Sequence, residues 1–148
     1  MDNSFLIAYR ASCKSFEKAM TGLDKSFSHC QEIGIKEVYD FNETEAFDAL
    51  IIKLTRNSDV FFQQILKGYF KLKGEDKLFF IDKLNFLEKM KVIDNSDELM
   101  ALKSFRNQAV HEYSDIEFLE LYAEALSLTP IFKKVVNSFM IYIENESI

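Results

Sequence analysis

An arginine, an asparagine, a histidine and a tyrosine fall within eight residues of one another in the segment SFRNQAVHEYSD, residues 104–115. They are Arg106, Asn107, His111 and Tyr113, in a chain that has only two histidines. Histidine titrates near neutral pH and can transfer protons, whereas arginine presents a planar fork of donors that matches a phosphate. Asparagine can orient an imidazole or bind a phosphate oxygen. Together these side chains suit chemistry on a phosphodiester.

A base and a phosphate clamp, with no evident metal ligands, fit metal-independent cleavage of RNA. His111 would take the proton from a ribose 2′-OH, and the resulting oxygen would attack the adjacent phosphorus. Arg106 would stabilise the charge of the transition state, with Asn107 in a supporting role. The products would be a 2′,3′-cyclic phosphate and a 5′-OH, and DNA would not be cut. Arg106 and His111 are therefore the catalytic candidates.

An ordinary structural role explains the same residues and, on spacing alone, is the commoner case. His111 would sit in a last helical turn because a cation there suits the helix dipole. Arg106 would pair with an acid such as Glu112 or Asp115. Tyr113 would be a half-buried aromatic residue with a solvated hydroxyl.

The helical positions of Arg106 and His111 restrict how a site can form. Five residues on an ideal helix separate two side chains by about 140°, so one straight helix does not aim both at one small group. The helix could loosen at its end, where Ser114 and Glu117 predict a capping box and a new helix from 115. Alternatively, two copies of the helix could face each other across a dimer axis and pool their side chains.

The spacing of apolar residues predicts a chain that is helical nearly throughout. Helices are expected over residues 4–33, 43–72, 76–92, 96–113 and 115–143. Four glycines and one proline leave little material for turns. The predicted architecture is an all-α, antiparallel bundle of four or five helices, in a single domain spanning residues 1–148.

Several local signals predict where these helices begin, break and end. Gly22 and Gly34 are expected to weaken or end the first helix, and Asn42 with Glu45 resembles a capping box for the second. Pro130 predicts a kink or short break near residues 128–130, because proline removes an amide donor. The third helix is expected to bury Leu78, Ile81, Leu84, Leu87 and Met90.

The charge of the chain is uneven. The net charge is −6, which does not favour generic binding to nucleic acid. Residues 67–91, however, hold seven lysines against four acids, a local balance of +3. A solvated helix face is the commoner explanation, and the alternative is a track for phosphates beside the motif. The candidate RNA-binding residues are Lys67, Lys71, Lys73 and Lys103.

Asp59 is a weaker additional candidate. It falls near Ile52, Leu66 and Phe70 on the helical wheel of the second helix. A carboxylate there is either half-buried and paired or, more commonly, exposed.

Composition also limits the class of protein. No apolar run approaches the roughly 18 residues of a membrane span, and the N-terminus does not resemble a secretory signal, so we expect no membrane partner and a cytoplasmic location. Cys13, Cys30 and His29 lack the further ligands that a structural zinc site needs. We therefore expect no metal and no cofactor.

The motif Arg, four residues, His, one residue, Tyr resembles the signature of the HEPN superfamily, and in particular of its HepT-like toxins. The segment FIDKLNFLEKMKVIDNSDELMALKSFRNQAVHEYSD (80–115) is similar in layout to that family. The similarity spans about 47–143 and is most specific at 99–115. Residues 1–40 carry no such similarity.

The resemblance implies a HEPN-like bundle that forms a homodimer, with the two motifs facing a shared cleft. It implies an RNA-cleaving toxin that is neutralised by a minimal nucleotidyltransferase antitoxin. In such pairs the antitoxin can transfer AMP from ATP to the motif tyrosine, here Tyr113. Two alternatives stay open: a non-catalytic partner subunit of a nucleotidyltransferase that binds its substrate, and a plain helical interaction domain.

Overall fold

Helices make up nearly all of the computed structural model, which describes residues 3–109 and 115–146, with the side chains of 115–117 left out. Within these ranges the elements, in chain order, are α1 (Asn3–Ile33), α2 (Phe41–Val60), η1 (Phe61–Leu66), α3 (Lys67–Leu72), α4 (Phe80–Lys89), α5 (Ser96–Ala109) and α6 (Asp115–Asn145). α2, η1 and α3 follow one another without a gap, so the described residues form five helices. The predicted all-α architecture is confirmed.

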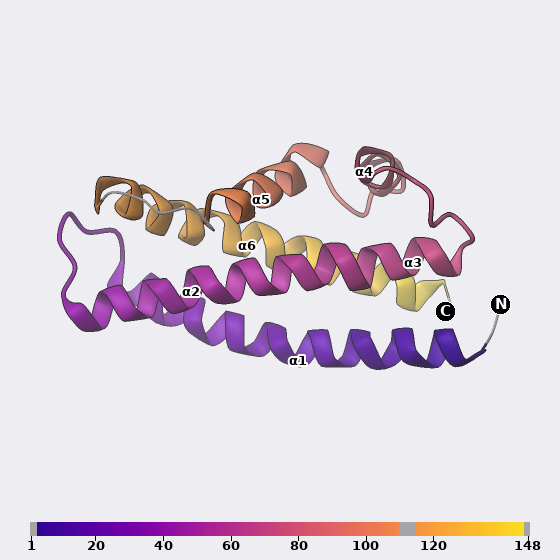
Figure 1. The fold of residues 1–148 in the computed structure, drawn as a ribbon, viewed down its shortest axis with the longest axis horizontal. Coiled ribbons are helices and arrows are strands. Elements are labelled where there is room, and N and C mark those ends of the chain that lie inside the picture. The colour runs from indigo at the N-terminus through magenta and orange to yellow at the C-terminus, as the bar shows by residue number, and fades with distance from the viewer. Residues whose placement is uncertain (1–2, 110–114, 147–148) are drawn as a thin grey trace.

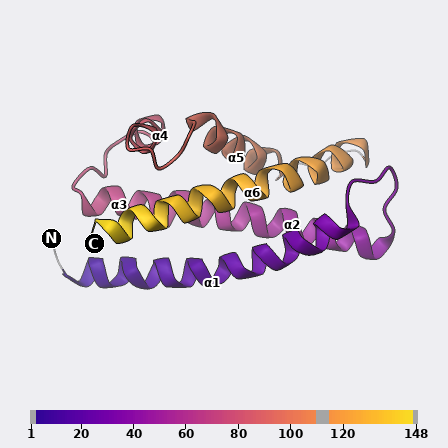
Figure 2. The same cartoon turned by 180° about the vertical axis from the view of Figure 1, so that it is seen from behind.

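Three long rods run side by side along the length of the molecule: α1, the rod formed by α2, η1 and α3, and α6 (Figure 1). α5 packs against both α2 and α6, and α4 packs against α5. α4 lies across the direction of the long rods, so Figure 1 shows it end-on. The view from behind shows the N-terminal start of α1 and the C-terminal end of α6 at the same end of the bundle (Figure 2).

The core is centred on phenylalanine rings from three elements. Phe61 of η1 is fully buried and meets Phe16 of α1 and both Phe132 and Phe139 of α6, with ring centroids 5.5–6.0 Å apart. Such large side chains dominate the apolar area that a helical core removes from water. Phe61 therefore lies where the three long rods meet.

The predicted capping box of α2 lies two residues too far along the chain. The cap is Asp40, whose Oδ1 accepts from the Glu43 amide at 2.8 Å, while Glu43 Oε1 accepts from the Asp40 amide at 3.0 Å. The segment DFNETE contains two overlapping boxes, Asp40 with Glu43 and Asn42 with Glu45. The structure forms the earlier box, in which the Asp40 carboxylate is also stabilised by the positive end of the helix dipole.

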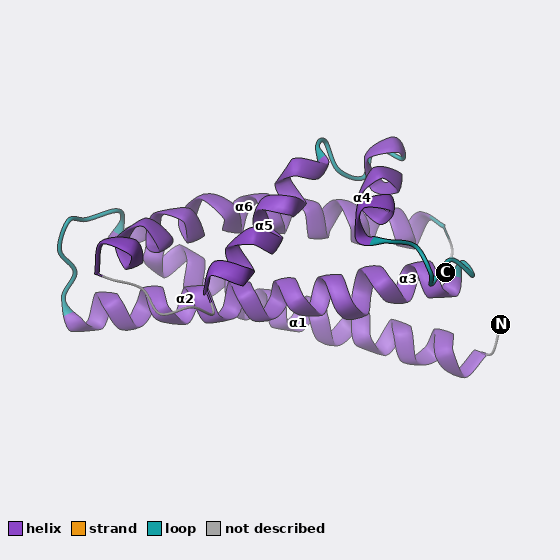
Figure 3. Ribbon diagram, turned by 45° about the horizontal axis from the view of Figure 1, so that its top comes forward, coloured by secondary structure: helices purple, strands orange, loops and turns teal. Residues whose placement is uncertain are grey.

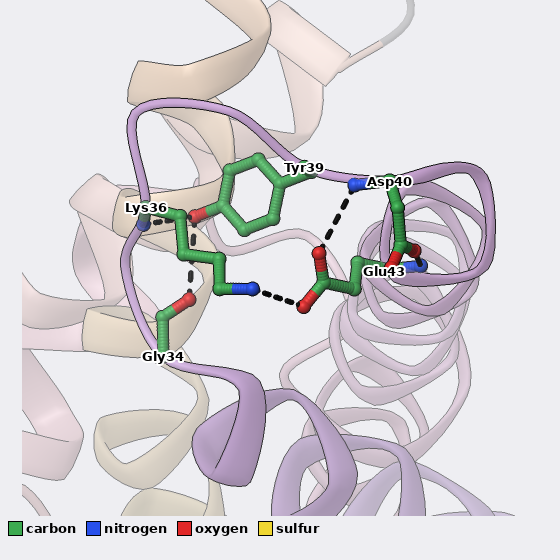
Figure 4. Close-up of polar contacts among 5 residues, drawn as sticks. All are labelled: Gly34, Lys36, Tyr39, Asp40 and Glu43. Carbon is green, nitrogen blue, oxygen red and sulfur yellow. Dashed lines mark hydrogen bonds and ion pairs between the residues drawn. The ribbon is translucent and has the colours of Figure 1, made fainter.

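The loop before α2 is held by the same residue that closes the box (Figure 4). Lys36 Nζ donates to Glu43 Oε2 at 2.5 Å, and the Lys36 amide donates to the Tyr39 hydroxyl at 2.9 Å. The hydrogen bond from Lys36, the Asp40 amide and the nearby ammonium lower the pKa of Glu43. α1 continues through Gly22 and ends just before Gly34, which has a positive φ of 76°.

Between α2 and α3 the rod contains a π-helical segment, η1, that the apolar spacing did not predict. Tyr9 of α1 fixes this segment, because its hydroxyl donates to the Ile65 carbonyl at 2.7 Å. The Tyr9 ring lies against Gly68, where an added Cβ would come within 2.7 Å of two ring atoms. π segments leave backbone groups out of the regular ladder and often occur at functional sites.

α4 differs from its prediction in length and in its buried face. It spans Phe80–Lys89 instead of 76–92, because a turn with positive φ at Gly74 precedes it and Lys91, also at positive φ, follows it. Leu84 and Leu87 are buried as expected, whereas Ile81 and Met90 are exposed. The side chain that takes the expected place of Ile81 on the buried face is Lys83.

The predicted break near Pro130 is wrong, because α6 runs unbroken from Asp115 to Asn145. Pro130 is exposed, whereas Leu128, Thr129 and Phe132 around it are buried. This packing holds the helix together across the missing amide donor. The start of α6 at Asp115 agrees with the predicted new helix, and the capping role of Ser114 lies outside the described residues.

Candidate functional site

Arg106 lies in the last turn of α5 and forms an ion pair with Asp59 of α2. Its Nε donates to Asp59 Oδ1 at 3.0 Å and to Oδ2 at 3.3 Å. The two side chains are 42% and 41% exposed, so solvent reaches the pair. The hydrogen bonds to Asp59 use Nε, and neither Nη1 nor Nη2 donates to that carboxylate. Of the two outcomes considered for Asp59, pairing is the one observed.

Asn107 contacts the guanidinium of its neighbour. Arg106 Nη1 donates to Asn107 Oδ1 at 3.3 Å, which is long for a charged donor. This contact makes Asn107 a partner of the Arg106 guanidinium. Its predicted alternative, orienting the imidazole of His111, involves a residue outside the described ranges.

His111 and Tyr113 both belong to the segment 110–114, which lies outside the described residues. The convergence of Arg106 with His111 therefore stays a prediction, as does a role for Tyr113. The structural alternative is observed for Arg106 in part, because it pairs with an acid, Asp59; Glu112 and the side chain of Asp115 lie outside the described residues.

Arg106 and Asn107 lie on the wall of a groove of about 640 Å³ between the α2–η1–α3 rod, α4 and α5. Figure 3, turned by 45° from the view of Figure 1, shows α4 and α5 in front of the long helices. The floor includes residues of the π segment, and the groove is lined by Asp59, Phe62, Gln63, Gln64, Lys67, Asp76, Phe80, Lys83, Lys103, Arg106 and Asn107, among others. Its volume falls in the range of about 300–1,000 Å³ that is usual for small-ligand sites.

The lining of the groove is cationic. It contains three lysines and one arginine against two aspartates, and one of these, Asp59, is already paired with Arg106. In an acidic chain this local excess attracts anions through the field of the whole groove. Two of the predicted RNA-binding residues, Lys67 and Lys103, line it together with Arg106.

The other two predicted RNA-binding residues lie elsewhere. Lys71 has its Nζ over the Phe5 ring, 4.6 Å from the centroid. Lys73 forms an ion pair with Glu146 at 2.8 Å, at the end of the chain. Neither lines the groove. Lys71 lies one turn beyond Lys67 and contacts α1 instead, and Lys73 follows the end of α3.

Lys83 is the lining residue that the sequence analysis missed. It is only 9% exposed, and burial, with Lys67 nearby, lowers its pKa. The signal was present in the sequence, since Phe80, Lys83 and Leu87 have the three- and four-residue spacing of a buried face. The apolar spacing favours Ile81 for that face, so Lys83 counts in the sequence only as one of the seven lysines of residues 67–91.

An aromatic wall separates the cations of the groove from the core. Phe62 of η1 and Phe80 of α4 meet edge to face, with centroids 5.3 Å apart. Lys103 of α5 places its Nζ over the Phe80 ring at 4.4 Å from the centroid. This cation–π contact holds Lys103 toward the groove.

Comparisons with known proteins found no relative. No protein-family model matches the chain, no curated protein matches it, and no solved structure matches its fold.

Two searches of the described residues, 3–109 and 115–146, were negative. No helix there combines the length and apolar character needed to cross a membrane. No group of three or more histidine, cysteine or acidic side chains there is arranged to hold a metal ion.

Proposed function

We propose that the protein is a HEPN-like toxin that cleaves RNA without a metal ion and is neutralised by a cognate nucleotidyltransferase. The observation that carries this proposal is the position of Arg106. Its guanidinium is held by Asp59 on the wall of a cationic groove, and His111 follows five residues later in the sequence. This supports a phosphate clamp with a base supplied close by.

The proposed reaction is an in-line transfer within the RNA strand. His111 removes the proton from a 2′-OH, and that oxygen forms a bond to the adjacent phosphorus. The bond from phosphorus to the 5′-oxygen breaks, and this oxygen leaves as a hydroxyl after it takes up a proton. Arg106 stabilises the negative charge that grows on the phosphoryl oxygens.

We further propose that two copies of the chain form the working unit. About 140° separates Arg106 and His111 on one straight helix, and a two-fold axis near the end of α5 would bring the His111 of one copy towards the Arg106 of the other. Sedimentation at micromolar concentration should give twice the 17.3 kDa mass of the chain. A monomer that cleaves RNA would rule out the shared site.

Control by the partner is proposed to act at Tyr113, in the cytoplasm. Transfer of AMP from ATP to the Tyr113 hydroxyl, with release of pyrophosphate, would add a bulky anion seven residues after Arg106. Seven residues are about two turns of an ideal helix, so the two positions lie nearly in line. The anion would compete with RNA for the clamp. Mass spectrometry of the chain after incubation with the neighbouring nucleotidyltransferase and ATP would detect the added group on Tyr113.

The proposed function is tested by RNA cleavage in the presence of EDTA. We expect R106A and H111A each to lower the cleavage rate at least about a hundredfold, the usual scale for loss of a general base or a charge-stabilising donor. Circular dichroism should show that both variants keep the helical fold. Cleavage that persists in both variants would show that the motif is structural.

A further inference from the structure

The groove contains a buried lysine that the proposed reaction does not use. Lys83 of α4 is 9% exposed. Among the residues that the structure describes, no carboxylate forms an ion pair with its ammonium and no acceptor takes a hydrogen bond from that group. The buried part of Lys83 is its apolar stem, because Thr55 Oγ1 is the buried side-chain atom without a hydrogen-bond partner among the described residues; the Lys83 ammonium therefore reaches the groove and is available to a ligand.

The surroundings of Lys83 are poor in negative charge. Lys67 is near enough to lower its pKa further, after burial itself. Of the two aspartates in the groove, Asp59 is held by Arg106, and Asp76 is exposed and forms no ion pair with a described residue. Two neighbouring ammonium groups that form no ion pair with a described carboxylate favour a bound anion.

The walls of the site strengthen such binding. Phe62 and Phe80 line the same groove as Lys83 and form an apolar part of its wall, and charges interact more strongly where the local dielectric is low. The amides of Gln63 and Gln64 are exposed on the floor and supply neutral donors. A phosphate with two free oxygens matches this combination of donors.

We propose that Lys83 and Lys67 form a second phosphate subsite in this groove, which binds a phosphodiester of single-stranded RNA next to the one held by Arg106. The inference rests on the proposed function for the identity of the strand. The groove volume of about 640 Å³ suits one or two nucleotides and does not suit a duplex. The subsite would hold the strand so that one phosphate meets the clamp.

The test measures binding without cleavage. The probe is a fluorescein-labelled 2′-O-methyl RNA oligonucleotide, which lacks the attacking hydroxyl, and anisotropy gives its affinity for the full chain over a series of salt concentrations. We expect K83M to weaken binding about tenfold and to reduce the slope of log affinity against log salt by about 0.7, the loss of one phosphate contact. K83R, which keeps the charge, should retain most of the affinity.

Two controls separate charge from folding. Methionine keeps the apolar stem of Lys83, so K83M should unfold at the same temperature as the unaltered chain or higher. K89M makes the same charge change in the last turn of α4, outside the groove, and should leave the salt slope unchanged. Equal affinity and slope for K83M and the unaltered chain would overturn the subsite and leave Lys83 as a filler of the core.

The outcomes distinguish the subsite from the proposed function. Binding that depends on Lys83, together with no cleavage of any RNA, would support the subsite and overturn the nuclease. Cleavage of RNA, together with a binding affinity that K83M does not change, would support the nuclease and overturn the subsite. Competition with ATP and with inorganic phosphate identifies the source of the phosphate, and a Lys83-dependent affinity for ATP alone would overturn the assignment to RNA.

Discussion

The ion pair between Arg106 and Asp59 contributes little to stability, but it orients the guanidinium. Both side chains are about two-fifths exposed, and exposed pairs contribute about 0–1 kcal/mol to stability. The contact through Nε nevertheless fixes the plane of the guanidinium and directs its other two nitrogens. Asp59 therefore positions the Arg106 guanidinium, which under the proposed function is the phosphate clamp.

Replacement of Asp59 by asparagine should separate the effect of the ion pair on stability from its effect on the orientation of Arg106. We expect D59N to change the free energy of unfolding by less than about 1 kcal/mol, to keep or improve the affinity for 2′-O-methyl RNA, and to lower the cleavage rate. Urea denaturation, anisotropy and a cleavage assay measure the three effects. D24N is the matched control, because Asp24 pairs with Lys133 outside the groove. Equal cleavage by D59N and D24N would count against positioning.

At the residue scale the sequence indicated Arg106 and Asn107 but not their surroundings. Asp59 is 47 residues from Arg106, and a helical wheel shows only the face on which such a residue lies. The pairing depends on how α5 crosses α2. Lys83 is not predicted for a related reason: the helical wheel of α4 places Ile81 and Met90 on the buried face, and both are exposed.

At the scale of elements, the apolar spacing predicted five helices and most of their positions. It did not predict the π segment, because a widened turn changes the ladder of backbone bonds and leaves the apolar character of Phe61, Phe62, Ile65 and Leu66 unchanged. Contacts from another helix specify it instead. Tyr9 bonds to the Ile65 carbonyl, and its ring requires the absence of a side chain at position 68.

Two glycine substitutions test this contact between α1 and the rod. G68A should lower the free energy of unfolding by about 1–3 kcal/mol, because the new Cβ would meet a Tyr9 ring that is buried and held by its hydroxyl. G22A should raise it by roughly 0.5–1 kcal/mol, because an added Cβ at Gly22 meets nothing within 4 Å. Urea denaturation measures both. Stabilisation by G68A would show that Tyr9 moves freely.

Glu146, which follows α6, joins the end of that helix to the end of α3. Both of its carboxylate oxygens lie 3.1 Å from the Tyr69 hydroxyl, and Lys73 forms an ion pair with it at 2.8 Å. Burial alone would raise the pKa of Glu146, but hydrogen bonds from Lys73, Tyr142 and Tyr69 outweigh it and lower the pKa below 4.5. The lowered pKa makes this contact a source of stability that depends on pH.

The sign of this dependence follows from linkage. Because the folded pKa lies below the unfolded value of 4.5, the stabilisation is present above pH 4.5 and is lost as the pH falls through the folded value. E146Q should therefore cost about 1 kcal/mol at neutral pH and progressively less in acid. E144Q, a change at an exposed neighbour, should be neutral at both. A cost for E146Q that is equal at both pH values would contradict the linkage.

For the whole molecule, the uneven charge of the sequence was the informative feature. The chain carries a net charge of −6, yet Lys67, Lys83, Lys103 and Arg106 line one groove. The sequence indicates an excess of lysine over residues 67–91, but it does not indicate which of these lysines lie on the same face of the folded molecule. Only the packing of α4 and α5 on the rod brings Lys83 and Lys103 to the groove and leaves Lys71 and Lys73 outside it.

The proposed function is tested most directly by an oligonucleotide of deoxyribonucleotides that contains a single ribonucleotide, incubated with the unmodified protein and EDTA. We predict one cut on the 3′ side of that ribose, which leaves a 2′,3′-cyclic phosphate and a 5′-OH. Neither the cut nor these ends should form with R106A. Cuts at deoxyribonucleotides, or ends that carry a linear 3′-phosphate from the outset, would contradict attack by a 2′-OH, and failure to cut any RNA would contradict the nuclease itself.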